Sequence, residues 1–343
     1  MQTVAIVGLG LIGGSVGLGL RRWAETNQAN GKPALQVVGF DTSLENQGYA
    51  QKLKAVDRAA WDIVRAVGDA DLVVVATPVA VMADVFQSIA PRLKAGAVVT
   101  DVGSTKSQVL RWAQEFLPRT ASFVGGHPMA GKTQSVEGAE ADLFKGATWC
   151  IAPSVTADEE AVRTVLGMVS ALGAEPFFVD PGEHDAYVAG VSHLPFVLSA
   201  ALMRAVSSDP SWRDMKSLTA GGFRDASRLA AGSPAMHRDI LLTNREAVAR
   251  WVDAVSTQLD EVRAALAADA ETAETVLTNF FTEARDARAV WSTQTTREGD
   301  LLQNTGDELS PEKFGDHVGR MFLGGLARRR RSGDGATTKT TTR

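Results

Sequence analysis

Two different patterns of apolar and polar positions meet near residue 180. Before that point, short apolar runs rich in Val, Ile and Ala alternate with stretches in which apolar residues recur at helical spacing. Short apolar runs of this kind are typical of buried strands, and repeated strand–helix alternation predicts a parallel sheet with helices on both faces. The predicted strands are residues 3–7, 36–40, 71–76, 97–100, 122–124, 147–152 and 175–179. The first predicted helix ends at about residue 23, and the second begins at about residue 43. Further helices are predicted over residues 79–90, 105–116 and 158–172.

The second pattern begins after Asp180-Pro181-Gly182, which breaks the alternation. From there the spacing of apolar residues predicts helices over residues 183–207, 212–228 and 233–293. We therefore expect a first domain over residues 1–180, an all-helical domain over 181–305 and a C-terminal segment over 306–343. Wide apolar helix faces can be buried against a second copy of the chain, so we expect a homodimer through the helical domain.

A glycine motif follows the first predicted strand directly. Gly8-Leu9-Gly10-Leu11-Ile12-Gly13 has the spacing GxGxxG and opens a helical stretch. Such glycines permit a tight turn, close approach of the backbone to a pyrophosphate, and close packing of helix on strand. The free N–H groups at the start of the helix favour an anion. We expect this motif to bind a dinucleotide, and the fold to be α/β, with a Rossmann-type doubly wound parallel sheet followed by the helical domain. The expected cofactor-binding residues of the motif are Gly8, Gly10, Leu11, Ile12 and Gly13.

Asp41 stands at the end of the second predicted strand, where an acidic side chain binds the ribose 2′-hydroxyl of NAD. The gap from Gly13 is longer than usual, and the polar stretch 25–33 accounts for it as a long loop. A carboxylate repels a 2′-phosphate, and residues 42–45 contain no arginine to bind one, so NAD is favoured over NADP. Asp41 could also cap the helix that starts near Ser43, and the two roles are compatible.

Several residues with candidate chemistry follow predicted strands. Because the carboxyl ends of parallel strands meet at one edge of a doubly wound sheet, and ligands bind there, we expect these residues to lie close together. They are Gly13, Asp41, Thr77, Ser104 and His127. We expect Thr77 and Pro78 to contact the cofactor.

His127 lies in the stretch VGGHPMAG, between glycines and a proline that break helix and strand alike. We expect it on a rigid turn at a strand end, where an imidazole can act as a general base. The alternative is an ordinary surface-loop histidine. Ser104 could orient that imidazole, or it could cap the helix that follows.

Composition and charge exclude several classes of protein. The 343 residues are 45% hydrophobic and 22% charged, which is typical of a globular protein, and the single cysteine, Cys150, leaves no disulfide framework or cysteine metal cluster. We expect no metal site. The net charge is −5, and residues 328–343 contribute +5, so residues 1–327 carry −10. An acidic body argues against nucleic-acid binding, and the basic tail should be disordered. The apolar stretch 3–20 is rich in glycine and has no preceding Lys or Arg, so we expect no signal peptide, no membrane helix and a cytoplasmic protein.

Seven motifs in order and spacing resemble the prephenate/arogenate dehydrogenase family of tyrosine biosynthesis, over about residues 1–300. They are GLGLIGGS at 8–15, ATP at 76–78, TDVGSTK at 100–106, GHPMAG at 126–131, GAEADLF at 138–144, HDAYVAGVSHLP at 184–195 and GGFRDASRLA at 221–230. The resemblance implies NAD-dependent oxidative decarboxylation of prephenate to 4-hydroxyphenylpyruvate, of arogenate to tyrosine, or of both.

The resemblance also implies roles for individual residues. His127 takes the proton of the substrate's ring hydroxyl, and Ser104 is its hydrogen-bonding companion. Arg228 binds a substrate carboxylate, which suits a planar guanidinium, and Arg224, four residues earlier, assists it. His193 either lines the substrate cleft or is satisfied within the helix packing. The alternative for both arginines is a solvated helix face paired with Asp225.

Two departures from the family pattern leave the substrate preference open. Many members have a second histidine where this chain has Phe196, and many have an acidic residue two positions beyond GHPMAG. Two other functions remain as alternatives: another NAD-dependent dehydrogenase of the β-hydroxyacid type, and a non-catalytic dinucleotide-sensing protein.

Overall fold

The computed structural model describes residues 2–28, 34–132 and 134–305, and the side chains of residues 2–27, 34–132 and 134–293. By its internal contacts the chain divides into two compact units, Met1–Ser256 and Thr257–Arg343. The first unit holds the sheet and the helical residues from Pro181 to Ser256. The domain boundaries expected at 180/181 and 305/306 stay predictions, and the expected disordered tail lies outside the described residues.

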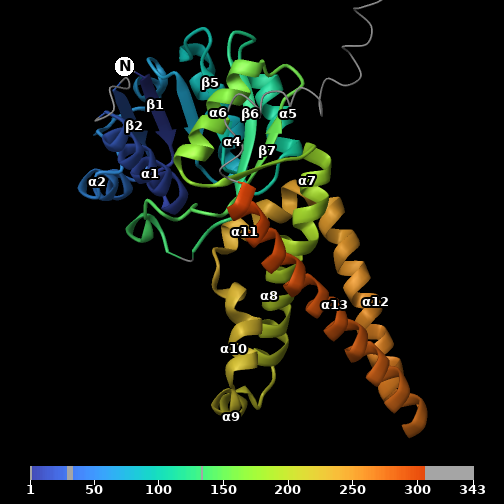
Figure 1. Cartoon of the computed structure of the whole chain (residues 1–343). Helices are drawn as coiled ribbons and strands as arrows, with labels where there is room; N and C mark the ends of the chain where they lie inside the picture. Colours follow the sequence, from blue (N-terminus) through green and yellow to red (C-terminus); the bar gives the residue numbers. More distant parts are fainter. Residues whose placement is uncertain (1, 29–33, 133, 306–343) are drawn as a thin grey trace, which may run out of the picture. The chain divides into compact units, whose positions relative to one another are not determined.

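The first unit is built on an eight-stranded sheet with the order β3-β2-β1-β4-β5-β6-β7-β8 (Figure 1). Its strands are β1 (Gln2–Val7), β2 (Leu35–Phe40), β3 (Arg58–Ala59), β4 (Leu72–Val75), β5 (Val98–Asp101), β6 (Ser122–Pro128), β7 (Thr148–Pro153) and β8 (Glu175–Phe178). Every predicted strand is present. The strand order reverses beside β1, and the carboxyl ends of the strands there form the edge at which such sheets bind ligands.

The sheet is parallel from β3 to β6, as predicted, but β7 runs antiparallel to β6 and β8 runs parallel to β7. The predicted parallel sheet is therefore confirmed, with one antiparallel pair, β6 and β7, that the sequence did not predict. Parallel neighbours need a crossover connection, usually through a helix. Among the described residues between β6 and β7, the only helical segment is the short 3₁₀ turn η3 (Val136–Gly138), and β7 returns along β6 in the opposite direction.

Helices cover both faces of the sheet because successive strand residues point to opposite sides. Val4 and Ile6 of β1 pack with α1 and α6, whereas Ala5 and Val7 pack with α3, α4 and α5 (Figure 1). The helices of this part are α1 (Leu11–Gln28), α2 (Leu44–Lys52), α3 (Ile63–Val67), α4 (Met82–Ile89), α5 (Ser107–Phe116) and α6 (Glu159–Ala171). This arrangement confirms the predicted doubly wound fold.

The chain after β8 is helical, as predicted. Asp180, expected to break the pattern, is the N-cap of the next helix, because its side chain accepts hydrogen bonds from the backbone N–H groups of Gly182 and Glu183. The helices are α7 (Pro181–Val188), α8 (Leu194–Ser207), α9 (Trp212–Met215), α10 (Gly221–Ser227), α11 (Pro234–Thr243), α12 (Arg245–Ala267) and α13 (Ala270–Thr305). A single π-helical turn, η4 (Ala189–His193), joins α7 to α8, so the helix is continuous over Pro181–Ser207.

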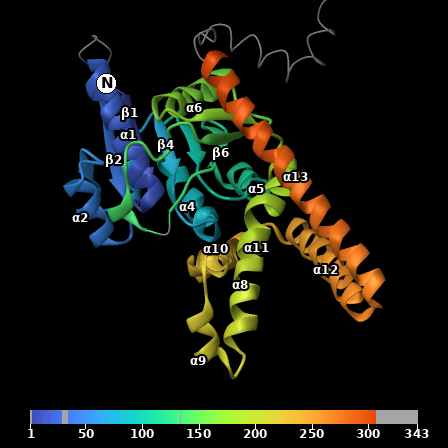
Figure 2. The same cartoon turned by 60° about the horizontal axis from the view of Figure 1, so that its bottom comes forward.

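One predicted helix of this part is wrong. Residues 212–228 form two short helices rather than one, because the backbone is extended at Thr219 and Ala220 before the glycine pair that opens α10. α8 and α10 lie side by side, and α10 continues into the 3₁₀ turn η6 (Arg228–Ala231) (Figure 2). α7 packs against α5, and α11 packs against the 3₁₀ turn η1 (Val79–Val81) that precedes α4. These contacts join the helical segments to the sheet within the first unit.

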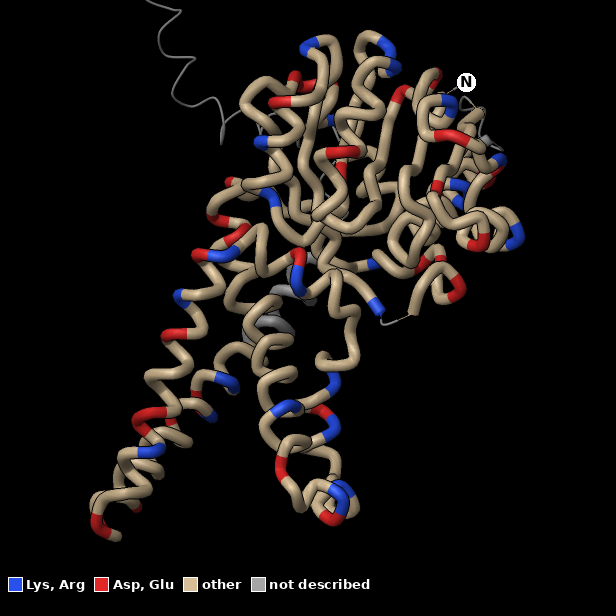
Figure 3. The backbone as a smooth tube through the Cα atoms, turned by 180° about the vertical axis from the view of Figure 1, so that it is seen from behind, with Lys and Arg blue, Asp and Glu red and all other residues tan. Residues whose placement is uncertain are grey.

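Charged residues lie mainly on the helices and loops, with Lys and Arg interspersed among Asp and Glu (Figure 3). Within the part of the chain that the structure describes, one helix, Pro181–Ser207, has the length and composition needed to cross a membrane, with a mean hydropathy of 1.5. The second unit contains the last turns of α12 and the helix α13, and it exposes several large apolar side chains, among them Leu259, Leu266 and Phe281.

Candidate active site

The glycine motif forms a tight turn at the carboxyl end of β1. Gly8 has φ +98°, and a Cβ atom there would lie 2.5 Å from the carbonyl oxygen of Ala76. A Cβ atom on Gly13 would lie 1.9 Å from the carbonyl oxygen of Gly8, so this glycine lets α1 pack on the turn. Around Gly10, by contrast, no atom lies within 4 Å of such a Cβ. The backbone is therefore open at the start of α1, where Leu11 and Ile12 present their N–H groups, and this opening fits a pyrophosphate.

Asp41 is held against this turn. Its Oδ2 accepts a hydrogen bond from the backbone N–H of Leu9 at 2.7 Å, and its Oδ1 accepts one from Ser43 N–H at 2.8 Å. The N-cap of α2 is Ser43, whose hydroxyl accepts from Asn46 N–H, so the hypothesis that Asp41 caps this helix is wrong. The carboxylate is fixed beside the glycine turn, in the position expected for a ribose-binding group.

Thr77 and Pro78 follow β4 at the same edge of the sheet. Pro78 is exposed, whereas the hydroxyl oxygen of Thr77 is buried and has no hydrogen-bond partner among the described residues. Buried hydroxyls are nearly always hydrogen-bonded, so an orphan at this edge indicates a place for a ligand or a water molecule. Three observations on this edge therefore fit a dinucleotide: the open Gly10, the anchored Asp41 and the unpaired Thr77.

His127 lies within β6 and is buried, paired with Cys150 of β7 across the antiparallel ladder. Both the rigid turn and the surface-loop alternative are therefore wrong for this residue. The strand residues before it, Gly125 and Gly126, are glycines because the neighbouring atoms leave no room for a side chain. A Cβ atom on Gly126 would lie 2.5 Å from the carbonyl oxygen of Asp101 and 2.9 Å from Nε1 of Trp149.

The imidazole of His127 is hydrogen-bonded to a second histidine. Its Nδ1 lies 2.9 Å from Nε2 of His184, and Nδ1 of His184 lies 2.9 Å from Oδ1 of Asp185. The two rings meet edge to face, with centroids 5.1 Å apart. Nε2 of His127 forms no hydrogen bond with a described residue. The three side chains thus form a chain, Asp185–His184–His127, which leaves one ring nitrogen of His127 for a ligand.

Asp185 also caps α5. Its two oxygens accept hydrogen bonds from the backbone N–H groups of Lys106 (2.7 Å) and Ser107 (2.9 Å). Burial raises the pKa of Asp185, but the hydrogen bonds from His184, Lys106 and Ser107 outweigh it, so that the pKa lies below its ordinary value. The carboxylate is therefore charged at neutral pH.

Burial and neighbouring charge keep His127 neutral. Its pKa lies well below 6.5, first because the ring is buried and then because His184, Lys106 and His193 disfavour a positive charge there. A neutral imidazole is the form that can accept a proton. His127 thus has the charge state of a base at neutral pH.

Lys106 forms a fully buried ion pair with Asp101 at the end of β5. Asp101 also accepts hydrogen bonds from the backbone N–H groups of Gly103 (2.8 Å) and Gly126 (3.1 Å). Both ends of the carboxylate are engaged, so the pair ties the loop after β5 to β6, one residue before His127.

Ser104 does not cap α5, because the helix starts at Ser107 and Asp185 satisfies its first N–H groups. The capping hypothesis is therefore wrong. The Ser104 hydroxyl also forms no hydrogen bond with His127 among the described residues, where His184 occupies that position instead. Its role as a companion of the base stays a prediction.

His193 is fully buried in η4. Its Nδ1 lies 3.2 Å from Nδ2 of Asn244, which also donates to the backbone oxygen of Asp185, and its Nε2 has no partner in the described part of the chain. Burial lowers the pKa of His193 to about 4. One side of the ring is satisfied in the helix packing and the other is available to a ligand.

Arg224 and Arg228 are both exposed, in α10 and η6. Neither forms an ion pair with Asp225 in the described structure, so that part of the alternative is wrong. No hydrogen bond joins either arginine to His127 or His193. The backbone N–H of Ala230 donates to Ser199 Oγ of α8 at 3.0 Å, which fixes their segment on that helix. Their contact with substrate stays a prediction.

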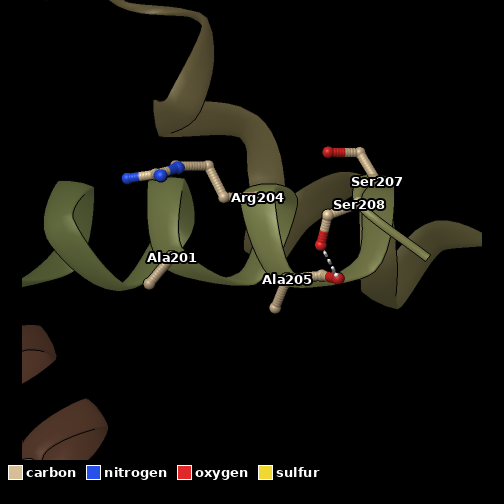
Figure 4. A pocket seen from close by; sticks show the side chains of 5 residues that line it. All are labelled: Ala201, Arg204, Ala205, Ser207 and Ser208. Carbon is tan, nitrogen blue, oxygen red and sulfur yellow. Dashed lines mark hydrogen bonds between the residues drawn. The ribbon is translucent and has the colours of Figure 1, made fainter.

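The sequence did not predict roles for His184, Asp185, Lys106 or Asn244. A usable signal was present for two of them: a His–Asp pair in the first turn of a helix, following a capping Asp-Pro. A separate hollow of about 540 Å³ lies along α8 and its C-cap and contains none of the predicted site residues. Figure 4 shows the side chains that line it. Its lining is Ala201, Arg204, Ala205, Ser207 and Ser208.

Comparison with known proteins matches most of the chain. Residues 24–177 match the family model described as prephenate dehydrogenase, nucleotide-binding domain, and residues 180–282 match prephenate dehydrogenase, dimerization domain. The chain is 34% identical over 290 residues to the prephenate dehydrogenase of Bacillus subtilis, covering 84% of this chain and 75% of that protein. It is 31% identical over 267 residues to the cyclohexadienyl dehydrogenase of Zymomonas mobilis, covering 77% and 88%. Among solved structures, the prephenate dehydrogenase of A. aeolicus in complex with hydroxyphenyl propionate and NAD+ superposes with a TM-score of 0.75 at 29% identity, covering 84% of this chain and 98% of that one.

Proposed function

The chain belongs to the prephenate dehydrogenase family, and we propose that it uses NAD+ to decarboxylate prephenate, arogenate or both oxidatively in tyrosine biosynthesis. The observation that carries this proposal is the neutral, buried His127, whose Nε2 remains available at the sheet edge that also bears the glycine turn. Because the chain belongs to this family, we set aside the two alternatives, a β-hydroxyacid dehydrogenase and a dinucleotide sensor.

The cofactor is held by residues at the carboxyl ends of β1, β2 and β4. Gly8, Gly10 and Gly13 shape the turn, the start of α1 takes the pyrophosphate, and Asp41 takes the ribose hydroxyls. Bound NAD+ supplies the acceptor for a hydride from the ring carbon that bears the hydroxyl. The charge of Asp41 supports NAD over NADP, since a carboxylate beside the ribose repels a 2′-phosphate.

His127 handles the proton of the reaction. Its Nε2 accepts the proton of the ring hydroxyl, while the ring carbon that bears this hydroxyl loses its hydride to NAD+ and becomes a carbonyl carbon. The bond between the ring and its carboxylate then breaks, CO2 leaves, and the bonding electrons make the ring aromatic. The phenolic oxygen takes the proton back from the imidazolium, so the reaction neither gains nor loses a proton. Ser104, beside the same strand ends, is proposed to bond the reacting oxygen or orient the base.

Substrate carboxylates are assigned to the helical part of the site. We place Arg228 on one of them, with Arg224 in support, because both guanidinium groups are free of ion pairs in the described structure and a planar fork binds a carboxylate bidentately. His193, through its unpaired Nε2, is assigned to the substrate cleft.

The assembly is proposed to be a homodimer through the helical segments, which expose Tyr187, Val191 and Leu218. Burial of this surface against a second copy accounts for the apolar character of Pro181–Ser207, whose first half carries the buried His184, Asp185 and His193. We therefore propose a cytoplasmic enzyme with a small-molecule substrate and with neither a membrane nor a nucleic acid as partner.

The test is an assay of the purified chain with prephenate and with arogenate, each combined with NAD+ and with NADP+, in which NADH or NADPH absorbance is followed. We expect rapid reduction of NAD+ with at least one substrate and slower reduction of NADP+. A 3-hydroxy acid with NAD+ serves as the control and should give no reduction. Absence of reduction with both cyclohexadienols would overturn the proposed function, and a preference for NADP+ would overturn the role of Asp41.

A further inference from the structure

We propose that His184 and Asp185 are positioning residues that hold His127 in the one neutral tautomer whose Nε2 can accept a proton. This inference rests on the proposed function, because it concerns the same base. Neither His184 nor Asp185 touches the glycine turn or the free nitrogen of His127, so both would act through the orientation of His127.

The first step is the orientation of His184. Asp185 is a charged carboxylate, so it can only accept hydrogen bonds, and its Oδ1 lies 2.9 Å from Nδ1 of His184. His184 Nδ1 must therefore carry a hydrogen. In the proposed arrangement this is the only N–H of the His184 ring, so Nε2 of His184 is left as an acceptor.

The second step is the position of the hydrogen on the His127 ring. Nε2 of His184, an acceptor, lies 2.9 Å from Nδ1 of His127, which must then be the donor. The single N–H of neutral His127 is used in this bond, and its Nε2 keeps the lone pair that a base requires. The opposite tautomer of His127 would place two lone pairs against each other in a buried site, at the cost of the hydrogen bond.

Capping of α5 does not explain this arrangement. The cap needs only the two Asp185 oxygens that accept from Lys106 and Ser107 N–H. The His184 ring adds nothing to the cap, yet it is 1% exposed and has both nitrogens engaged. The other titratable or charged groups that face His127 are Lys106 from the start of α5, His193 from η4 and Cys150 from β7, and none of them forms a hydrogen bond with its Nδ1.

Two substitutions of His184 separate the proposal from a merely structural role. His184→Phe keeps a ring of similar size but removes both hydrogen bonds. His184→Gln keeps them, because the Asp185 carboxylate draws the amide N–H₂ toward itself and leaves the amide oxygen to accept from His127 Nδ1. His237→Phe is the matched control. His237 is a partly buried histidine that stacks on Phe196 at 4.1 Å, and phenylalanine preserves the stacking.

The measurement is made on the full chain with ¹⁵N-labelled histidine, of which there are five. The ring-nitrogen shifts of His127, assigned by its own substitution, report which nitrogen bears hydrogen, and they need no turnover. We expect hydrogen on Nδ1 in the wild type, His184→Gln and His237→Phe, and a mixture of tautomers in His184→Phe. With the substrate that the wild type uses, we expect kcat to fall about 10²–10⁴-fold in His184→Phe, with KM and NAD+ affinity nearly unchanged and substantial recovery in His184→Gln.

The outcomes distinguish this inference from the proposed function. A wild type without activity but with hydrogen on Nδ1 would overturn the proposed function and leave the tautomer assignment standing. Hydrogen on Nε2 of wild-type His127, or near-normal kcat in a folded His184→Phe, would overturn the positioning role. If His184→Phe does not fold, the shifts of the wild type and the activity of His184→Gln still decide the matter, because an inactive, folded Gln variant contradicts the proposal.

Discussion

At the scale of single residues, the site combines groups whose charge states are fixed by burial and by hydrogen bonds. Burial, and then the neighbouring His184, Lys106 and His193, keep His127 neutral, whereas hydrogen bonds keep Asp185 charged. A base of this kind is ready at neutral pH without first losing a proton, and the activity it supports should decline only in acid, as pH falls through the lowered pKa of His127.

His127→Asn should nearly abolish turnover and leave NAD+ binding intact. Removal of a general base typically costs about 10²–10⁴-fold in rate, and His127 lies on β6 while the glycine turn follows β1. Steady-state kinetics and a titration of NAD+ against protein fluorescence provide the two measurements. A near-normal kcat at neutral pH would show that another group is the base.

His193 makes the stability of the fold depend on pH. Burial lowers the pKa of His193 to about 4 from its ordinary 6.5, so the unfolded chain binds more protons between these values. The contribution of neutral His193 to the free energy of unfolding should therefore be fully present above pH 6.5 and be lost as the pH falls toward 4. The loss should be about 3 kcal/mol, at 1.36 kcal/mol for each pKa unit. Urea unfolding of the wild type and His193→Asn at pH 7 and pH 5 isolates this contribution, and equal losses in both proteins would contradict it.

Arg228→Ala should raise KM for the substrate by about 100-fold and leave the thermal midpoint and NAD+ binding almost unchanged. Loss of one partner of a desolvated charge pair costs about 2–5 kcal/mol, and the exposed Arg228 makes no ion pair that the fold would lose. Arg228→Lys should recover only part of the affinity, since an ammonium lacks the planar fork. A large fall in melting temperature with little change in KM would mark Arg228 as structural and move the assignment to Arg224.

At the scale of secondary-structure elements, close approach of backbones explains why glycines stand inside a strand. Gly126→Ala should lower the free energy of unfolding by about 1–3 kcal/mol, because its Cβ would meet the Asp101 carbonyl oxygen at 2.5 Å. Gly10→Ala is the matched change. It has open space around the Cβ and should preserve stability while weakening NAD+ binding. Chemical unfolding and NAD+ titration of both variants test the pair, and equal stability losses would remove the distinction.

Elements determined by neighbouring residues in the sequence could be predicted, whereas features determined by residues far away along the chain could not. The strands follow from apolar runs and the glycine turn from its spacing. The start of α5 depends on Asp185, about 80 residues away, which caps it in place of Ser104. His127 was misplaced for a similar reason, because β7 pairs with the VGGHP segment and makes it a strand. The Asp185–His184–His127 chain joins two elements in three dimensions, so no spacing along the sequence encodes it.

At the scale of the whole molecule, the apolar surface of the helical segments should decide the assembly. Tyr187 and Val191 lie four residues apart, one turn along the continuous helix Pro181–Ser207, and both of them, with Leu198 farther along, are exposed in a single chain. Val191 is 75% exposed in the turn η4, two residues before His193. A face of this kind is typical of the contact between two copies of a chain.

Val191→Glu should therefore weaken the proposed homodimer. Each buried valine contributes about 1.5–3 kcal/mol, and two-fold symmetry counts the change twice, so the dissociation constant should rise by about 100-fold or more. Val155→Glu is the control, since Val155 is 95% exposed in the loop after β7 and lies outside this face. Sedimentation velocity over a range of concentrations should give dimers for the wild type and Val155→Glu, and monomers for Val191→Glu at low concentration. A monomeric wild type would contradict the homodimer, and a wild type that partitions into lipid vesicles unless residue 191 is charged would instead assign the apolar face of Pro181–Ser207 to a membrane.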